Sequence, residues 1–343
     1  MTYVATGSNR ATMNRLRTAA LRVQYASDLH LELNPGSFQT ILKPVAPVLA
    51  LAGDIGRPDL PEYRNFMAYC SNNWERVFVV AGNHEFYNKT TAKKWAWSHP
   101  HTVDMRRDMC AKVATSFPNI TFMDRSRVEY KGVSFLGCTL WTDLSDAYHA
   151  DIASRHMNDY QVITEDCKVP ITPATTTAWH QTDRAWLAHE IRSSADLGLP
   201  TVVITHHLPT HRMTSERWAY HPLNPAFASE CDDLMRPPVR VWIAGHTHTG
   251  MTFRTADDVM GCVNPRGYPG EVTGYCREIF VEISTDVRDG DCGDVRDPAL
   301  VAAAGPAFGA APREPSGARP LAESDGAPVP RRSEEPEQSL DWV

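Results

Sequence analysis

Seven short apolar runs, separated by longer stretches that can hold helices, most limit how this chain of 343 residues can fold. The runs are rich in Val, Ile and Leu, and a nearly continuous apolar strand has to be covered on both faces. They occupy residues 21–27, 48–52, 77–81, 133–137, 201–205, 239–244 and 279–283. Three intervening stretches, 61–75, 103–116 and 175–195, predict helices, the last with Trp179, Trp186, Leu187 and Ile191 on one apolar face. This alternation predicts an α/β layered fold.

Five of the apolar runs are followed directly by polar side chains of the types that form binding sites. These side chains are Asp28 and His30, Asp54, Asn83 and His84, His206 and His207, and His246 and His248. In a sheet of parallel strands, the carboxyl ends meet at one edge, and ligands bind there. The sequence therefore predicts that five loops converge on a single site.

The residue types in these loops predict which kind of ligand binds. Neutral imidazoles and carboxylates bind divalent transition metals, and none of the five loops carries a cysteine, which excludes a sulfur-rich site. Seven side chains are candidate ligands: Asp28, His30, Asp54, Asn83, His206, His246 and His248. Seven ligands are too many for one tetrahedral ion but suit two ions that share a bridging carboxylate. Gly53, Gly82 and Gly245 precede ligands in sharp turns, where a missing side chain lets the backbone approach the ions.

The ordered series D-x-H, G-D, G-N-H-E, H-H and G-H-T-H resembles the calcineurin-like metallophosphoesterase superfamily over roughly residues 21–283. The resemblance implies a four-layer αββα sandwich with two central mixed β-sheets and a dinuclear metal site at the carboxyl ends of the strands. It also implies phosphoester hydrolysis. Carried over by position, the first ion would be held by Asp28, His30 and His248, the second by Asn83, His206 and His246, and both by Asp54.

The resemblance also assigns His84 as the catalytic histidine beside the phosphate. Two divalent ions polarise the phosphoryl oxygens and lower the pKa of a shared water, and the resulting bridging hydroxide attacks phosphorus in line. No nucleophilic Ser or Cys is then needed. A protonated His84 stabilises the charge that builds on the substrate oxygens or donates a proton to the leaving group. We take Mn²⁺ as the default metal, although Fe, Zn, Co and Ni suit the same ligands.

Three further side chains are candidates for contact with the substrate. Arg57 lies close enough to reach a phosphate, and an ordinary salt bridge is the alternative. Arg266 lies in the turn-rich string VNPRGYPGE. His207 faces away from its neighbour His206 and is expected to pack or to orient a partner. Glu85 is expected to support its turn through hydrogen bonds.

Two segments are candidate walls of the site. Residues 86–101 interleave Lys89, Lys93 and Lys94 with Trp95 and Trp97, a pattern that suits the phosphate and base of a nucleotide. An amphipathic helix with buried tryptophans is the alternative. Residues 142–163 carry His149, Arg155, His156 and Asn158 and are either a cap over the site or an exposed excursion.

Composition sets the outer limits of the folded part. Residues 284–343 are rich in Pro, Ala and Gly and hold 12 acidic and 6 basic residues, so they account for −6 of the net charge of −7. We predict that this tail and residues 1–20 are disordered, leaving a single domain over 21–283. No secretion signal or membrane span is detectable, and the cysteines form no C-x-x-C pair. A cytoplasmic location with no membrane partner is therefore predicted.

Three functions compete on these observations. The leading one is a dinuclear-metal-dependent phosphoesterase acting on a monoester or a diester, with a nucleotide as one candidate substrate. A DNA or RNA nuclease is the second, but residues 1–283 carry a net charge of only −1, which does not favour a nucleic acid. The third is a catalytically inactive scaffold with the same fold. Such a scaffold would be expected to lack a ligand or the histidine, and here none is missing.

Overall fold

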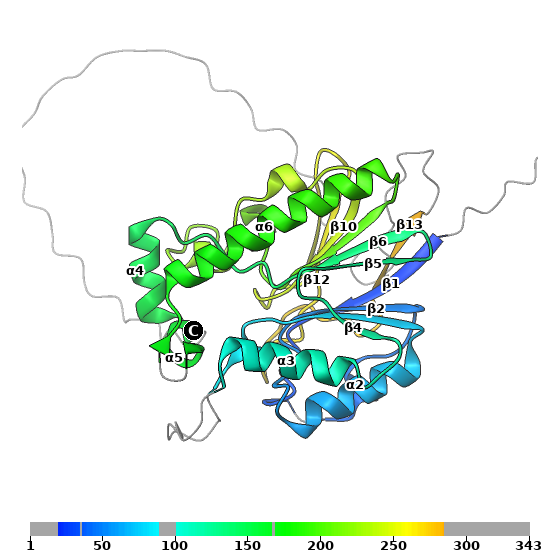
Figure 1. Cartoon of the computed structure of the whole chain (residues 1–343), viewed down its shortest axis with the longest axis horizontal. Helices are drawn as coiled ribbons and strands as arrows, with labels where there is room; N and C mark the ends of the chain where they lie inside the picture. Colours follow the sequence, from blue (N-terminus) through cyan, green and yellow to red (C-terminus); the bar gives the residue numbers. More distant parts are fainter. Residues whose placement is uncertain (1–19, 35, 89–100, 167–168, 285–343) are drawn as a thin grey trace, which may run out of the picture. The chain divides into compact units, whose positions relative to one another are not determined.

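Two β-sheets pack face to face, and helices cover the outer face of each (Figure 1). This arrangement is seen in a computed structural model that describes residues 20–34, 36–88, 101–166 and 169–284. The described residues all belong to one compact unit, Met1–Arg296. The α/β prediction with two mixed sheets is confirmed.

The first sheet has five strands in the order β13-β1-β2-β3-β4. Their bounds are β1 Ala20–Ala26, β2 Val48–Ala52, β3 Arg76–Val80, β4 Ile120–Phe122 and β13 Phe280–Ser284. All neighbours are parallel except β13, which runs antiparallel to β1. Helices α2 (Pro61–Asn73) and α3 (Val103–Ala114) contribute buried side chains to the core on one face of this sheet. A short helix, α1 (Phe38–Ile41), lies between β1 and β2 in sequence.

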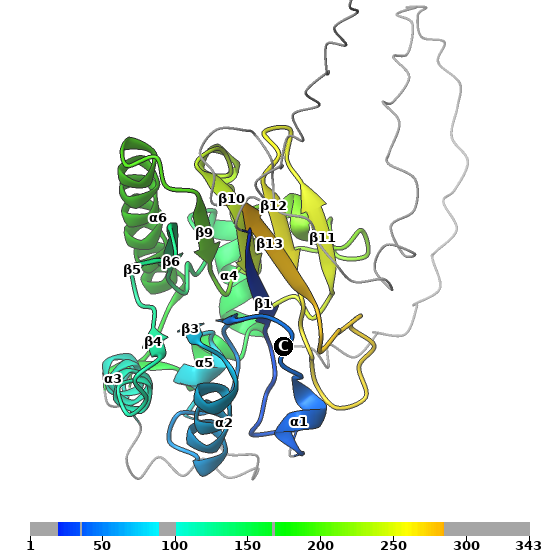
Figure 2. The ribbon, with the colours of Figure 1, turned by 90° about the vertical axis from the view of Figure 1, so that its right-hand side faces the viewer.

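The second sheet has six strands in the order β11-β12-β10-β9-β6-β5. Their bounds are β5 Ser126–Tyr130, β6 Val133–Gly137, β9 Thr201–Ile204, β10 Val239–Ala244, β11 Met251–Arg254 and β12 Met260–Val263. The four central strands are parallel, and both edge strands are antiparallel to their neighbours. Helix α6 (Pro173–Asp196) lies against the strands of this sheet (Figure 2). Thr172 and Thr175 close its first turn in a capping box.

The faces between the sheets explain why the strands are apolar throughout. Every residue of β2 and of β6 is buried. The rings of Phe78 on β3 and Phe135 on β6 stack across the interface, with their centroids 4.4 Å apart. Each central strand therefore packs on the opposite sheet with one face and on helices with the other.

Two excursions leave the sheets near the carboxyl ends of the strands. The first carries α4 (Ala147–His156), α5 (Asp159–Val162), β7 (Thr164–Asp166) and β8 (Val169–Pro170). The second carries three short 3₁₀ helices, His211–Met213, Asn224–Ala226 and Asp232–Leu234. The two excursions contact each other, since His149 Nδ1 on α4 donates to the Pro222 carbonyl oxygen at 2.8 Å.

All seven apolar runs form strands whose ends differ by at most one residue from the expected ones, and all three expected helices form within two residues of their expected starts and ends. Ala20 and Ser284, which the sequence placed in disordered tails, are ordered residues that pair with each other in β1 and β13. The rest of both tails, and residues 89–100 with the lysines and tryptophans considered for nucleotide binding, lie outside the described residues. Within the described ranges, no helix has the length and apolar character needed to cross a membrane.

Candidate metal centre

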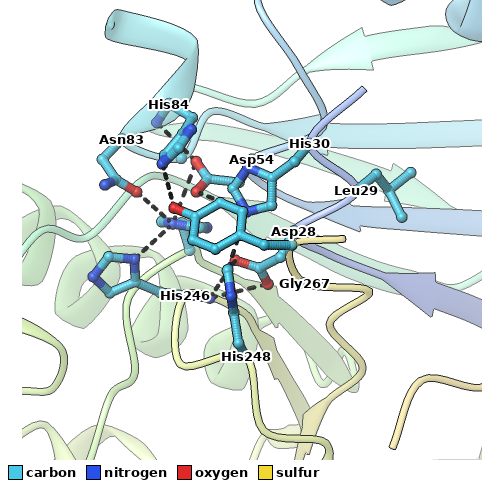
Figure 3. A network of polar contacts seen from close by, with 12 residues as sticks. Asp28, Leu29, His30, Asp54, Asn83, His84, His246, His248 and Gly267 are labelled. Carbon is cyan, nitrogen blue, oxygen red and sulfur yellow. Dashed lines mark hydrogen bonds and ion pairs between the residues drawn. The ribbon is translucent and has the colours of Figure 1, made fainter. Parts of the chain in front are cut away.

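The loops that follow β1, β2, β3, β9 and β10 converge, as predicted, and bring all seven predicted ligands together (Figure 3). Asp28, His30 and His248 form one cluster, which we call the first cluster; one ligand atom from each lies within 4.8 Å of the others. The second cluster consists of Asp54, His206 and His246 at the same spacing, with Asn83 Oδ1 3.0 Å from His206 Nε2.

Five of these seven residues have a backbone conformation that non-glycine residues rarely adopt. Their φ angles are 52° at Asp28, 44° at His30, 54° at Asp54, 71° at His246 and 46° at His248. A left-handed backbone costs of order 1–3 kcal/mol and persists only where the surroundings enforce it, typically at functional sites. The strand ends therefore turn abruptly, which brings Asp28 and His30 into the same cluster and places His246 and His248 in different clusters.

Asp54 lies between the two clusters. Its Oδ2 is 3.8 Å from His30 Nε2 in the first cluster, and its Oδ1 is 3.5 Å from His206 Nε2 in the second. One carboxylate thus presents an oxygen to each cluster, which is the geometry that a bridging ligand requires.

Outer hydrogen bonds orient the rings of the first cluster. His248 Nδ1 donates to Glu271 Oε2 at 2.8 Å, so its Nε2 points towards His30 Nε2 at 3.0 Å and Asp28 Oδ1 at 3.5 Å. Both Asp28 oxygens accept from the His246 backbone N–H, at 3.0 and 3.1 Å. A carboxylate on the far nitrogen of a ligating histidine fixes both the ring and its tautomer.

The second cluster is oriented in the same way by different partners. His206 Nδ1 donates to the Ala52 carbonyl oxygen at 2.9 Å, which leaves the Nε2 lone pair facing Asn83 Oδ1. Asn83 Nδ2 in turn donates to Asp159 Oδ1 at 2.8 Å, so its oxygen is the atom that faces the cluster. Two acceptors 3.0 Å apart repel each other unless a cation lies between them, and these residues therefore fit a metal ion.

Burial keeps most of the imidazoles neutral, as metal ligands have to be. It lowers the pKa of His30 to about 3 and that of His206 to about 4, and it holds the pKa of His246 well below its ordinary value. His248 differs, because Asp28 and Glu271 outweigh burial and raise its pKa to about 9. His246 Nε2 and His30 Nδ1 are buried without a hydrogen-bond partner among the described residues. Neutral nitrogens beside carboxylates suit a divalent transition metal.

Glu85 ties the loops after β2 and β3 together. Its carboxylate accepts four backbone N–H groups, those of Asp54 at 3.0 Å, Ile55 at 2.8 Å, Gly56 at 3.2 Å and Gly82 at 2.7 Å. The expected turn-supporting role of Glu85 is therefore confirmed. Gly82 is required by close approach, since a Cβ at this position would overlap Asp54 Oδ1.

His84 lies beside the first cluster, with its ring centroid 4.4 Å from that of His30. Its Nδ1 donates to Glu32 Oε1 at 3.1 Å, and its Nε2 is 3.0 Å from the Tyr268 hydroxyl. The ring of Tyr87 stacks on that of His84, with their centroids 4.2 Å apart. His30, Glu32 and His84 also form a third group of closely spaced ligand atoms, which shares His30 with the first cluster.

The three candidate substrate contacts have protein partners. Arg57 forms a two-point ion pair with Asp59, with Nη2 to Oδ2 at 2.6 Å and Nε to Oδ1 at 3.2 Å, as in the salt-bridge interpretation. Arg266 Nη1 donates to the carbonyl oxygens of Leu29 and Asn34 at 3.3 and 3.4 Å. His207 is buried, with its ring centroid 4.4 Å from that of His246. Their contact with a substrate stays a prediction.

Four residues of the site were not predicted from the sequence: Glu32, Asp159, Glu271 and Tyr268. Glu32 follows His30 in the string D-L-H-L-E, which was a usable signal. Asp159 is 76 residues away from Asn83, in the excursion considered as a cap. Glu271 and Tyr268 lie in the string VNPRGYPGE, from which only Arg266 was selected.

The two mixed sheets carry, at one edge, paired clusters that form a candidate dinuclear metal centre. The chain belongs to the calcineurin-like phosphoesterase family, whose model matches residues 21–250. Membership of this family implies that the chain binds divalent metal ions, and it places the chain in the class of metallophosphoesterases. The match ends before the string VNPRGYPGE, so Tyr268 and Glu271 lie outside it.

Known proteins resemble this chain to different degrees. An uncharacterized protein of Acanthamoeba polyphaga mimivirus, L509, is 27% identical over 283 residues, which cover 76% of this chain and 96% of the relative. The solved structure of Phosphopantetheinyl Hydrolase (PptH) from Mycobacterium tuberculosis aligns with a TM-score of 0.54 and 20% identity, over 74% of this chain and 91% of the other. A dimetal phosphatase from Danio rerio aligns with a TM-score of 0.46 and 14% identity, over 80% and 98%. The likeness to PptH shows a shared fold.

Proposed function

We propose that this protein hydrolyses a phosphomonoester or phosphodiester with two divalent ions, one bound in each of the two clusters. The observation that carries the proposal is the set of seven nitrogen and oxygen ligands, buried and oriented by outer hydrogen bonds, with Asp54 between two groups. An inactive scaffold would be expected to lose one of these ligands or His84, and all of them are present.

In this proposal Asp28, His30 and His248 hold the first ion, Asn83, His206 and His246 hold the second, and Asp54 holds both. Ions bound there would polarise a phosphoryl group and lower the pKa of a coordinated water. Mn²⁺ remains the default metal, and Fe, Zn, Co or Ni would suit the same nitrogen and oxygen donors.

The chain's own residues supply orientation and a polar contact for the substrate. Glu32 holds His84 by Nδ1, so that Nε2 faces the side of the site where Tyr268 lies. We assign His84 Nε2 to the substrate oxygen on which charge builds as the P–O bond breaks, either as a donor of a hydrogen bond or as the source of a proton. The hydrogen bonds from the backbone of Gly82 to Glu85 and from Asn83 to Asp159 hold the loop after β3 in place while the P–O bond breaks.

The test is hydrolysis by the full chain loaded with Mn²⁺. Bis(p-nitrophenyl) phosphate and p-nitrophenyl phosphate report on diesters and monoesters, and cyclic nucleotides, dinucleotides and single-stranded DNA extend the panel. We expect turnover of at least one class, lost in Asp54→Asn. A protein that binds two ions per chain and hydrolyses none of these compounds would overturn the proposal.

A further inference from the structure

The loop after β12 carries a tyrosine whose side chain reaches into the metal centre. Tyr268 lies with its ring centroid 4.6 Å from that of His30 and 4.6 Å from that of His248, two members of the first cluster. Its hydroxyl is 3.0 Å from His84 Nε2. A phenol oxygen thus stands beside the imidazole nitrogen that we assign to the substrate.

The backbone around Tyr268 is fastened to the end of β1. Arg266 N–H donates to the Ser27 carbonyl oxygen at 3.0 Å, and Gly267 N–H donates to that of Asp28 at 2.9 Å. Asn34 Nδ2 donates to the Gly267 carbonyl oxygen at 2.9 Å. These bonds fix the loop to the same turn that presents Asp28.

A second anchor fixes Tyr268 to the first cluster itself. The Tyr268 N–H donates to Glu271 Oε2 at 2.9 Å, and the same oxygen accepts from His248 Nδ1 at 2.8 Å. Gly267 has a φ of 75°, and a Cβ there would overlap the Glu271 carboxylate. One carboxylate oxygen therefore sets the position of a cluster ring and of the tyrosine backbone together.

We propose, as an extension that rests on the proposed function, that Tyr268 is a further catalytic residue, whose hydroxyl donates a hydrogen bond to the substrate oxygen that faces His84. The phenol oxygen and His84 Nε2 are 3.0 Å apart, so a single substrate oxygen can lie within hydrogen-bond reach of both. When a phosphoester binds, the bond between Tyr268 and His84 is replaced by two bonds to that oxygen. Charge that develops there then meets a donor already held in place.

Tyr268→Phe removes the hydroxyl and keeps the ring that packs on His30 and His248. We expect kcat on bis(p-nitrophenyl) phosphate to fall about 10- to 100-fold, as for loss of a hydrogen bond to a charged oxygen, with KM changed less than about twofold. Metal content should remain two ions per chain. Tyr275→Phe is the matched control, because its hydroxyl donates to the Ile41 carbonyl oxygen at 2.7 Å and serves no part of the site.

A double-mutant cycle separates contact with the substrate from mere orientation of His84. If Tyr268 touches the substrate, Tyr268→Phe still lowers kcat in the His84→Ala background. An effect that vanishes in that background makes Tyr268 a positioning residue and overturns the proposal, as does unchanged kcat in the single variant or a loss of metal. If the wild-type protein with two ions hydrolyses no phosphoester, the proposed function itself fails and the role of Tyr268 falls with it.

Discussion

Asp159→Ala is expected to weaken the binding of one metal ion and to leave the other in place. Asp159 contacts no ion in our assignment. Its Oδ1 accepts from Asn83 Nδ2 at 2.8 Å and from the Tyr87 hydroxyl at 2.6 Å. Without that carboxylate, Asn83 Nδ2 retains only its longer hydrogen bond to the Tyr87 hydroxyl, at 3.2 Å, so the amide is held less firmly with its oxygen towards His206 Nε2.

The size of the effect follows from how outer partners act on metal ligands. Their removal typically costs about 10- to 100-fold in affinity, which corresponds to about 1.4–2.7 kcal/mol. The loss should fall on the second cluster alone, since the hydrogen bonds described for Asp159 join it to Asn83 and Tyr87 and to no ligand of the first cluster. Asp159→Asn keeps an acceptor oxygen at the same position and should therefore weaken the ion less than Asp159→Ala does.

The assay is a calorimetric titration of the metal-free protein with Mn²⁺. The heats of binding are fitted to two sites. Asp159→Ala should show one site of wild-type affinity and one weakened site. Glu271→Gln is the reciprocal control, because Glu271 orients His248 in the first cluster. Equal weakening of both sites by Asp159→Ala, or no weakening, would refute the assignment of Asn83 to the second ion.

Three further predictions follow from the same contacts. His248 is protonated below about pH 9 because its pKa is raised, so a metal ion has to displace that proton in order to bind. The affinity of the first cluster for the ion should therefore fall as the pH drops below about 9. Calorimetric titrations in buffers of different ionisation enthalpy measure the proton that is released on binding. Gly82→Ala should lower the free energy of unfolding by about 1–3 kcal/mol in urea titrations, because a Cβ displaces Asp54; an unchanged midpoint would contradict the close approach. His84→Ala should keep two ions but lose about 100- to 10,000-fold in turnover, and full activity would remove His84 from the mechanism.

Most of the fold could be predicted from the sequence because a buried strand can be recognised from its own residues alone. A fully buried strand such as β2 has no polar face, so its pattern is visible in five residues. Most of the strands that were missed have the opposite character; β12 is the exception, since all four of its residues are buried. β5 and β11 are edge strands whose residues are all partly or fully exposed, and β4 is only three residues long. Neither an edge nor a short strand leaves a strong periodic signal.

The same distinction applies to the site. Some of its residues belong to recognisable sequence motifs, and others come close to the site only when the chain folds. The seven candidate ligands stand directly after strands, where position along the chain places them at the sheet edge. Asp159 and Glu271 act through hydrogen bonds to ligands that are 76 and 23 residues away in sequence, and no local pattern marks such a residue. The left-handed backbone at Asp28 and His246 is equally invisible, because sequence patterns report which side chains are present and not how a loop turns.

The central claim is that each of the two clusters binds one ion and that Asp54 is shared, and anomalous diffraction from crystals of the Mn²⁺-loaded protein tests it most directly. The account predicts two peaks roughly 3.5–4 Å apart on either side of Asp54, one near His248 and one near His206. A single peak would contradict it. So would a peak among His30, Glu32 and His84, the third group of closely spaced ligand atoms, because His84 would then be a ligand and not the partner of the substrate.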